Sequence, residues 1–476
     1  METYQLYING QWVPSESGQF IEVENPETRQ IIARVPRSCE ADINKAVAAA
    51  KAAFASWQFA PLAQRLERME RVLEAMRANR QRLIDTISAE LGCPVKVAAE
   101  MHTDPFLLET ANYIETARTY CYEERRDTSV VRREPVGVVA GLTPWNFPLE
   151  QIEKKVVPAL LAGCCVVLKP SQYTPLTAYL LAEFIHEAGY PQGVFNLVTG
   201  RGPEVGNALA LHPDVDMLSF TGSTAAGREL ARLALCNIKR LALELGGKSA
   251  AILLPGGDWD FGVKAVLDTV VLNAGQTCNA LTRLLVPAGD REKVNAILLK
   301  TLEQYRRGPN SDPNTDIGPL SSRRQFERVK QYIQIGLEEG AKLLCGGLPR
   351  EDGSYMVEPT IFVDVKPGMR IEREEIFGPV LAVVPYESVE DAVRIANDSD
   401  YGLAGAVFGP EEEANAVARR MRTGSIYVNR GQWDVTAPFG GYKQSGMGRE
   451  GAREGYEEFL EVKTIYDREA AGGGQA

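Results

Sequence analysis

PVGVVAGL, residues 135–142, begins the part of the chain that decides the fold. It is a short run of small and β-branched residues. Similar runs follow at 164–170 (CCVVLKP), 194–200 (VFNLVTG), 217–223 (MLSFTGS) and 240–247 (RLALELGG), and segments of helical composition separate them. This alternation is typical of βαβ units, in which helices cover a parallel sheet. We therefore expect an α/β fold.

The alternation continues on both sides of this stretch. Upstream, residues 41–57 and 61–91 have helical composition and periodicity. Downstream, a second block runs from about 248 to 430. Its predicted strands are RLLVP (283–287), VLAVVPY (380–386), AGAVFG (404–409) and SIYVN (425–429), and its predicted helices are 258–274, 290–306, 321–339 and 411–422. The final FLEVKTIYD (459–467) is an isolated strand pattern, of the kind that often pairs with another subunit.

Length and composition narrow the class of protein. The 476 residues suggest roughly three structural units at about 150 residues each, and a 45% hydrophobic, 24% charged composition is that of a soluble globular protein. The net charge of −11 disfavours a nucleic-acid partner. The longest apolar run (156–168) is too short to span a bilayer, and METYQLYING is not a secretory signal. We expect a cytoplasmic protein with no membrane partner.

The cysteines and histidines argue against disulfides and metals. Eight cysteines are scattered without a C-x-x-C motif, which favours reduced thiols, and the three histidines are far apart, so we predict no metal site. Cys278, in NAGQTCNA (273–280), differs from the others because it follows a Gly-Gln-Thr run. On composition alone it is either a packing residue or a nucleophile.

The loops after the predicted strands are the expected ligand site, because open parallel sheets bind ligands at the carboxyl ends of their strands. These loops read TPWNFP, KPSQ, TGRGPEVG, FTGSTAAG and ELGGK. GRGPEVG misses the dinucleotide fingerprint G-x-G-x-x-G by one residue. Gly222 and Ser223 could hold a pyrophosphate at a helix N-terminus, although they are also ordinary capping residues. Lys169 alone is best explained as a surface lysine.

Taken together, seven ordered motifs resemble the NAD(P)-dependent aldehyde dehydrogenase superfamily. They are TPWNFP, LKPS, FTGST, LELGGK, NAGQTC, EEIFGP and PFGGYKQSGMGRE, and the likeness runs from about residue 7 to 467. The resemblance implies a variant Rossmann dinucleotide-binding domain (1–119 and 138–247), an α/β catalytic domain (248–434), a small β oligomerisation element (120–137 and 435–467) and a flexible tail (468–476).

The resemblance also implies the catalytic residues. Cys278 matches the nucleophile that adds to the aldehyde carbon, and Glu244 matches the general base that activates Cys278 or, on firmer grounds, the hydrolytic water. Asn146 matches the oxyanion donor. Lys155 and Glu450 match a proton relay behind the base.

NAD or NADP is the implied cofactor. The residues implied to bind it are Thr143, Trp145, Lys169, Ser171, Gln172, Gly202, Gly206, Gly222, Ser223, Gly246, Glu375 and Phe377. Many NAD-preferring members carry a glutamate where this chain has Gln172. An amide does not repel a 2′-phosphate, so we expect NADP to be accepted better than is usual.

The substrate funnel departs from the pattern of members that act on apolar aldehydes. Its implied residues are Glu150, Gln151, Lys154, Leu272, Thr277, Trp433 and Phe439. Lys154 and Leu272 stand where aromatics are frequent, which suggests a polar aldehyde, with an ω-oxo carboxylic acid as the form that Lys154 would recognise. The alternative is that Lys154 simply pairs with Glu150 at i,i+4.

Two other functions stay open. A CoA-acylating relative would usually lack the glutamate base, and a non-catalytic dinucleotide-binding protein would be expected to lose Cys278 or Glu244. Both residues are present. The expected partners are a small-molecule aldehyde and further copies of the chain, as a homodimer or homotetramer.

Overall fold

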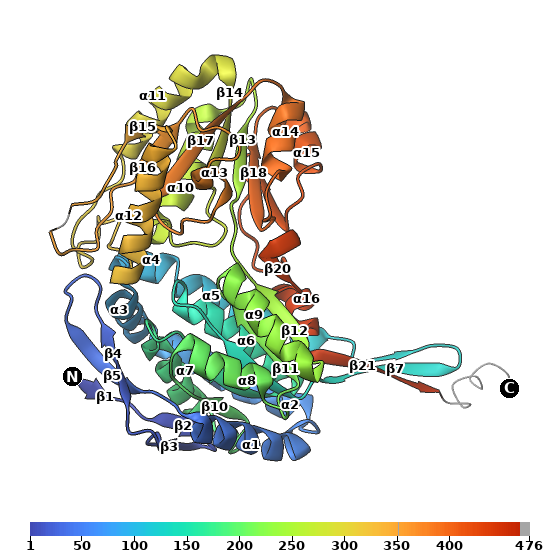
Figure 1. Cartoon of the computed structure of the whole chain (residues 1–476). Coiled ribbons are helices and arrows are strands. Elements are labelled where there is room, and N and C mark those ends of the chain that lie inside the picture. The colour runs from blue at the N-terminus through green and yellow to red at the C-terminus, as the bar shows by residue number, and fades with distance from the viewer. Residues whose placement is uncertain (351, 467–476) are drawn as a thin grey trace.

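The computed structural model describes residues 1–350 and 352–466. The predicted tail (468–476) lies outside the described residues. Two large sheets with their helices form two lobes, one built mainly from the first half of the chain and one from the second (Figure 1). The α/β class predicted from the alternating runs is confirmed.

The first large sheet has eight strands and carries the loops predicted as the ligand site. Its order is β20 (Gly446–Met447), β12 (Arg240–Glu244), β11 (Met217–Thr221), β8 (Val138–Leu142), β9 (Cys165–Lys169), β10 (Phe195–Leu197), β2 (Leu6–Ile8) and β3 (Gln11–Val13). The stretch from β12 to β10 is parallel. Strands β8, β9 and β10 are buried throughout, as expected of a sheet covered on both faces.

The second large sheet has seven strands. Its order is β15 (Lys342–Cys345), β16 (Thr360–Val363), β17 (Val380–Tyr386), β14 (Arg283–Pro287), β13 (Ala250–Leu253), β18 (Ala404–Phe408) and β19 (Ser425–Val428). All four strands predicted here are present, and only β15 runs antiparallel to its neighbour. The prediction missed β13, β15 and β16.

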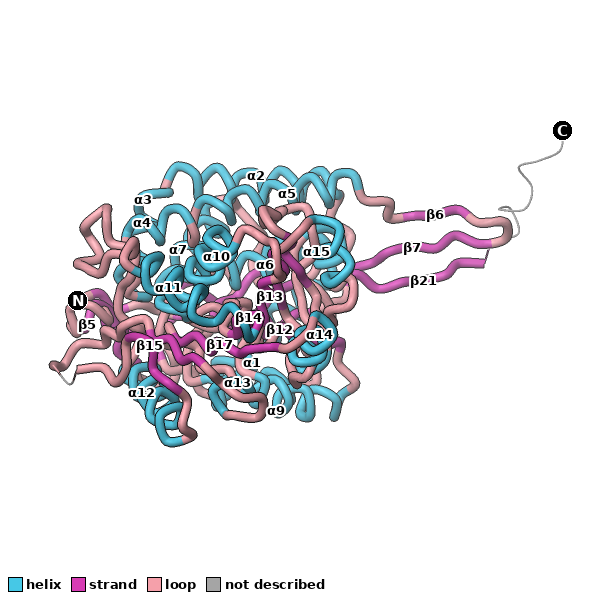
Figure 2. The backbone as a smooth tube through the Cα atoms, turned by 90° about the horizontal axis from the view of Figure 1, so that it is seen from above, coloured by secondary structure: helices cyan, strands magenta, loops and turns pink. Residues whose placement is uncertain are grey.

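A narrow antiparallel arm projects from the body (Figure 2). It consists of β6 (Glu123–Arg125), β7 (Ser129–Pro135) and β21 (Leu460–Tyr466), and β21 pairs with β7 over its whole length. The isolated final strand therefore has a partner within its own chain. Residues 446–447 belong to the eight-stranded sheet instead, and α16 (Ala452–Glu457) packs on α5. A small sheet orders β1 (Glu2–Thr3), β5 (Ile31–Pro36) and β4 (Phe20–Glu24).

Most of the predicted periodic segments are helical, although the helices predicted at 290–306 and 411–422 end at 302 and 418, and the helices at 95–100, 104–119, 370–373 and 389–397 were not predicted. In the first half they are α1 (Glu40–Trp57), α2 (Leu62–Ala78), α3 (Arg80–Leu91), α4 (Val95–Glu100), α5 (Asp104–Thr119), α6 (Pro148–Ala162), α7 (Leu176–Glu187), α8 (Asn207–Leu211) and α9 (Thr224–Ala234). In the second half they are α10 (Trp259–Val271), α11 (Arg291–Leu302), α12 (Arg323–Glu338), α13 (Arg370–Arg373), α14 (Val389–Asn397) and α15 (Glu411–Ala418). The stretch 61–91 is interrupted at Asn79, which separates α2 from α3.

Among the described residues, no helix is both long and apolar enough to cross a membrane.

Candidate active site

The predicted site lies along one edge of the eight-stranded sheet. Strands β8 to β12 end at Leu142, Lys169, Leu197, Thr221 and Glu244, and the five loops singled out in the sequence begin directly after them. Because parallel neighbours end at the same edge, these loops converge there.

Cys278 follows a strained turn. Asn273, Ala274 and Gly275 all have left-handed backbone, with φ of 51°, 53° and 73°. Such a run is costly for residues other than glycine and is found mainly at functional sites. A side chain at Gly275 would overlap the backbone of Gly378, so glycine is required where this turn meets the loop after Glu375.

Asn146 joins this turn to the loop after β8. Its Nδ2 donates to the Gln276 carbonyl at 3.1 Å, and its own carbonyl accepts from Asn273 Nδ2 at 2.8 Å. The Gln276 side chain donates back to the Asn273 carbonyl at 2.8 Å and accepts from the Ser321 amide at 2.9 Å. Asn146 is thus bonded to Gln276, which lies two residues before Cys278. An amide nitrogen has two protons, so the second Nδ2 proton can be donated to an oxyanion.

Cys278 as a residue is half-buried, and its thiol lies within electrostatic range of Lys154 and three glutamates. Burial raises its pKa, and Glu150, Glu375 and Glu244 raise it further. The thiol is therefore protonated at neutral pH, so its attack on a carbonyl carbon needs a proton acceptor.

Glu244 ends β12 and is buried. Neither of its carboxyl oxygens has a hydrogen-bond partner among the described residues. Burial, followed by the charge of Glu450, raises its pKa well above the ordinary value. A carboxylate with a raised pKa is a stronger base than an exposed one, which suits proton abstraction from water or a thiol.

Lys155 and Glu450 form a buried ion pair behind Glu244. Lys155 Nζ lies 2.5 Å from Glu450 Oε1 and donates to Thr221 Oγ1 at 2.7 Å. The structure therefore brings both residues of the predicted relay together, beside the ends of β11 and β12.

Glu375, predicted to hold a ribose, contacts the loop after β12. Its carboxylate accepts from the Gly247 amide at 2.9 Å, and a side chain at Gly246 would overlap it. Burial raises the pKa of Glu375 to about 7. Gly246 is thus a glycine because this carboxylate needs the space next to the backbone.

Three further residues near β8 and β9 fit a ribose or phosphate. Lys169 is buried, its Nζ donates to the Pro170 carbonyl at 2.9 Å, and burial lowers its pKa to about 8. Thr143 Oγ1 is buried and has no hydrogen-bond partner in the described ranges. Ser171 Oγ accepts from the Tyr173 amide at 3.2 Å, and Gln172 beside it is half-exposed. A buried hydroxyl without a partner and a buried amine on one carbonyl suit a polar ligand.

The glycines predicted to bind the dinucleotide differ in whether the structure requires a glycine at their position. A side chain at Gly222 would overlap the ring of Phe220, and Ser223 next to it caps α9 by accepting from the Ala226 amide at 3.3 Å. Gly206 packs at ordinary distance from Leu142 and Leu230. Gly202 faces open space, so nothing in the structure requires a glycine there.

Trp145 and Phe377 meet edge to face, with ring centroids 5.4 Å apart. Phe377 has left-handed backbone (φ 64°), and its carbonyl accepts from Gln325 Nε2. A strained bulky residue held by its surroundings is typical of a ligand-facing position. Together with Glu375, Thr143 and Lys169, this aromatic pair fits a dinucleotide.

The predicted substrate residues do not all lie in open space. Lys154 is buried and forms an ion pair with Glu150 at 2.6 Å, so the i,i+4 alternative is the arrangement present. The predicted contact of Lys154 with a substrate carboxylate would have to compete with this pair. Gln151 is also buried, and its Oε1 lacks a partner within the described ranges.

The remaining substrate residues line the other sides of this region. Phe439 lies over Lys154, with its ring centre 5.0 Å from Nζ. Leu272 and Thr277 are half-buried on the Cys278 turn, and the Thr277 hydroxyl lies 3.5 Å from the Leu272 carbonyl. Trp433 is 44% exposed.

The sequence reasoning missed three residues of this region. Glu109 on α5 is buried 3.8 Å from Lys154, and burial raises its pKa to about 7. Tyr427 on β19 is within electrostatic reach of both Lys154 and Cys278. Lys248 is buried, with burial lowering its pKa to about 7, and its Nζ is unpaired among the residues described. The position of Lys248 in LELGGK was the one available signal.

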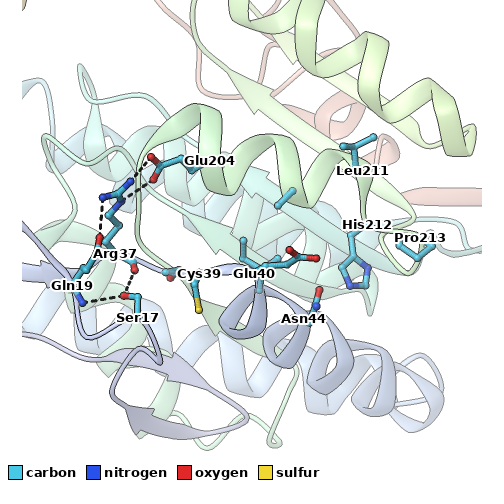
Figure 3. A pocket seen from close by; sticks show the side chains of 13 residues that line it. Ser17, Gln19, Arg37, Cys39, Glu40, Asn44, Glu204, Leu211, His212 and Pro213 are labelled. Atoms are coloured by element: carbon cyan, nitrogen blue, oxygen red, sulfur yellow. Dashed lines mark hydrogen bonds and ion pairs between the residues drawn. The ribbon is translucent and has the colours of Figure 1, made fainter.

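A separate pocket of about 820 Å³ lies between α1 and α8 (Figure 3). Arg37 there is bonded to Glu204 at 2.6 Å and to Gln19 at 2.9 Å, so its charge is already matched. None of the residues predicted from the motifs lines this pocket.

Comparison with known proteins gives one consistent family. The Aldehyde dehydrogenase family model matches residues 12–465. The 3-succinoylsemialdehyde-pyridine dehydrogenase of a Pseudomonas species is 46% identical, over 98% of this chain and 99% of its own. Aldehyde dehydrogenase C of Pseudomonas syringae, solved as a mutant with NAD+ and octanal, has a TM-score of 0.96 at 42% identity and covers 99% of this chain and 98% of its own. The Mycobacterium tuberculosis aldehyde dehydrogenase with NAD+ has a TM-score of 0.95 at 41% identity, covering 98% of each chain.

Proposed function

The chain belongs to the aldehyde dehydrogenase family, and on that premise we propose that it oxidises a polar aldehyde to a carboxylic acid through Cys278, with NAD or NADP as cofactor. The observation that carries the proposal is the Cys278 turn, held to Asn146 by two hydrogen bonds. This arrangement presents a thiol and an amide donor to the same carbonyl group.

Cys278 attacks the aldehyde carbon while its proton passes to a water molecule, and the product is a thiohemiacetal in its oxyanion form. The second Nδ2 proton of Asn146 stabilises the oxygen of that adduct. A bound nicotinamide dinucleotide would supply the hydride acceptor that this adduct needs to become a thioester on Cys278. Glu244 then takes a proton from water, which cleaves the thioester to the acid. Lys155 and Glu450 return the proton toward solvent.

The cofactor-binding residues are proposed from fit. Glu375 and Lys169 would hold the two riboses, Ser223 with Gly222 would meet the pyrophosphate, and Phe377 would pack near the nicotinamide. Gly206 fits as a close-packing residue, whereas Gly202 gains no support because its position is open. Gln172 leaves room for NADP beside NAD. The NAD+ complexes of the similar enzymes from Pseudomonas syringae and Mycobacterium tuberculosis support this choice of cofactor class.

The proposed substrate is an aldehyde with a second polar group. The relative named a 3-succinoylsemialdehyde-pyridine dehydrogenase supports an aldehyde that carries a further polar group. Glu150 and Lys154 place a polar pair next to the Cys278 turn, which also favours a polar far end. Glu244 favours water over CoA as the acyl acceptor, because hydrolysis needs a base and acyl transfer to CoA does not.

We further propose that the protein is a homodimer or homotetramer in the cytoplasm. The arm of β6, β7 and β21 presents exposed apolar side chains on its final strand, including Val462 (59% exposed) and Tyr466 (83%). All eight cysteines are free, which suits a reducing compartment.

The test is the absorbance of reduced cofactor at 340 nm, with a panel of apolar, aromatic and carboxylate-bearing aldehydes, each with NAD and with NADP. We expect turnover by the native protein and by Cys121→Ala, which removes an exposed thiol on the arm side, and none by Cys278→Ala. Equal turnover by Cys278→Ala would reject the proposal.

A further inference from the structure

One lysine and three carboxyl groups meet on α6 and α5, close to the Cys278 turn. Lys154 Nζ lies 2.6 Å from Glu150 Oε1 and 3.8 Å from Glu109 Oε1. Glu153 is fully buried, and its Oε1 accepts from Thr110 Oγ1 at 3.2 Å. A buried lysine among acids carries no spare positive charge.

Exposure distinguishes the members of this group. The side chains of Lys154 and Glu109 are both 2% exposed, whereas that of Glu150 is 16% exposed. The ring of Phe439, 5.0 Å from Lys154 Nζ, covers the lysine on another side. Glu150 is therefore the charged group of the set that reaches open space, and Lys154 lies behind it.

Glu150 also lies near the reaction centre. Glu150 lies on the first turn of α6, four residues after Asn146, which is bonded to the turn that presents Cys278. After burial, the charge of Glu150 raises the pKa of the Cys278 thiol. The pKa of Tyr427 is raised mainly by burial, and Lys154, Cys278 and Glu150 all contribute to its shift. A molecule bound at Cys278 and extending past Phe439 would meet the Glu150 carboxylate.

The net charge of this group of side chains determines which substrates fit, because it acts on the end of the substrate that lies away from the aldehyde (the far end). The charges of Glu150 and Lys154 cancel, and any ionised fraction of Glu109 gives the group a net negative charge. A substrate carboxylate here would lose its hydration beside Glu150 without gaining a free cation, and like charges placed together disfavour binding. A ketone, hydroxyl or heterocyclic nitrogen carries no negative charge and is not repelled by Glu150, and a cation would be attracted to it.

We propose that Glu150, held in place by Lys154, determines specificity by excluding aldehydes with a negatively charged far end and accepting those whose far end is polar and uncharged or positive. This inference rests on the proposed aldehyde oxidation and narrows its substrate class.

The experiment compares two aldehydes of equal length, succinic semialdehyde and 4-oxopentanal, which differ at the far end by a carboxylate against a methyl ketone. The quantity measured is the ratio of their kcat/KM values, which does not depend on the fraction of enzyme that is folded. We expect the native protein to favour 4-oxopentanal by about tenfold or more, the effect of one unmatched charge contact.

The decisive variant is Glu150→Gln, because it frees Lys154 from its nearest partner. We expect the ratio to move at least about tenfold toward succinic semialdehyde, a gain that general damage to the fold does not produce. Lys154→Met should move the ratio the other way, since it leaves Glu150 unmatched. Glu187→Gln, which alters an exposed acid at the end of α7, should leave the ratio unchanged.

Two results would overturn the inference. One is a native preference for succinic semialdehyde that Lys154→Met abolishes, because Lys154 would then bind the carboxylate directly. The other is a ratio that Glu150→Gln leaves unchanged. Oxidation of neither aldehyde, nor of any in the wider panel, with either dinucleotide would instead reject the proposed function, and the inference with it.

Discussion

At the scale of single residues, the site combines two acids whose pKa values are raised by burial. Glu244 has no hydrogen-bond partner in the described chain, and Glu375 has the Gly247 amide at 2.9 Å. A buried carboxyl without partners is costly, and such groups cluster where proton transfer is needed. The titration of Glu244 should appear in the pH dependence of kcat, and that of Glu375 in the pH dependence of dinucleotide binding.

Replacing Glu244 by Gln should slow thioester hydrolysis and leave acylation largely intact. We expect kcat to fall by about 10²–10⁴-fold, the usual contribution of a positioned base, while a burst of one reduced cofactor per subunit remains. Stopped-flow absorbance at 340 nm measures both. In the native protein, kcat should rise with pH as Glu244 loses its proton, and this rise should vanish in the variant. A variant without a burst would place Glu244 in acylation instead.

Dinucleotide binding should strengthen as pH rises through about 7. Burial raises the pKa of Glu375 to about 7, so the free protein holds a proton there below that pH. Ribose hydroxyls donate hydrogen bonds best to the ionised carboxylate. The Kd for NAD, measured by calorimetry between pH 6 and 8.5, should therefore decrease and then level off. Glu375→Gln should bind weakly at all these pH values; an unchanged slope in that variant would assign the titration to another group.

Single residues also mark the limit of the sequence reasoning. The motifs implied roles for Cys278 and Asn146 but none for Gln276, whose carbonyl accepts from Asn146 across 130 positions. Glu109 was not predictable, since α5 places it beside Lys154 from 45 positions away, and no i,i+4 pattern reports such a contact. The left-handed run through Ala274 was equally hidden, because alanine gives no signal of positive φ.

At the scale of elements, the loops after the parallel strands are built around required glycines. A side chain at Gly246 would overlap the Glu375 carboxylate, whereas Gly202 faces open space. Gly246→Ala should displace that carboxylate and lose a charge-assisted hydrogen bond of about 1.5–3 kcal/mol, which corresponds to roughly a tenfold or greater rise in the Kd for NAD. Gly202→Ala is the matched control and should bind normally. Equal effects of the two substitutions would show that Glu375 does not hold the cofactor.

Elements were predictable where apolar runs were continuous. RLLVP and VLAVVPY became β14 and β17 with unchanged limits, because strands buried on both faces consist almost wholly of apolar residues. β15 was missed because its residues are exposed or half-exposed and its pattern is short. α2 and α3 were merged because the break at Asn79 involves neither proline nor glycine.

At the scale of the whole molecule, the arm is the feature without an obvious role in a monomer. Successive residues of a strand point to opposite faces, so Val462 and Tyr466 share one face of β21 and Glu461 lies on the other. Ile465, on the same face as Glu461, is also exposed. Exposed apolar side chains gathered on one strand indicate an interface.

We expect Val462→Glu combined with Tyr466→Glu to shift the protein toward monomer, and Glu461→Gln to leave its mass unchanged. Light scattering after gel filtration measures the mass. A double variant that stays assembled would mean that the arm does not hold the subunits together.

The whole account depends on Cys278 as the covalent nucleophile. Peptide mass spectrometry of Glu244→Gln, mixed with 4-oxopentanal and NAD and then quenched in acid, tests this directly. Slow hydrolysis should let the thioester accumulate, so the account predicts an acyl group on the peptide that contains Cys278, and none when NAD is omitted. An acyl group on another residue, or cofactor reduction with no adduct at Cys278, would contradict it.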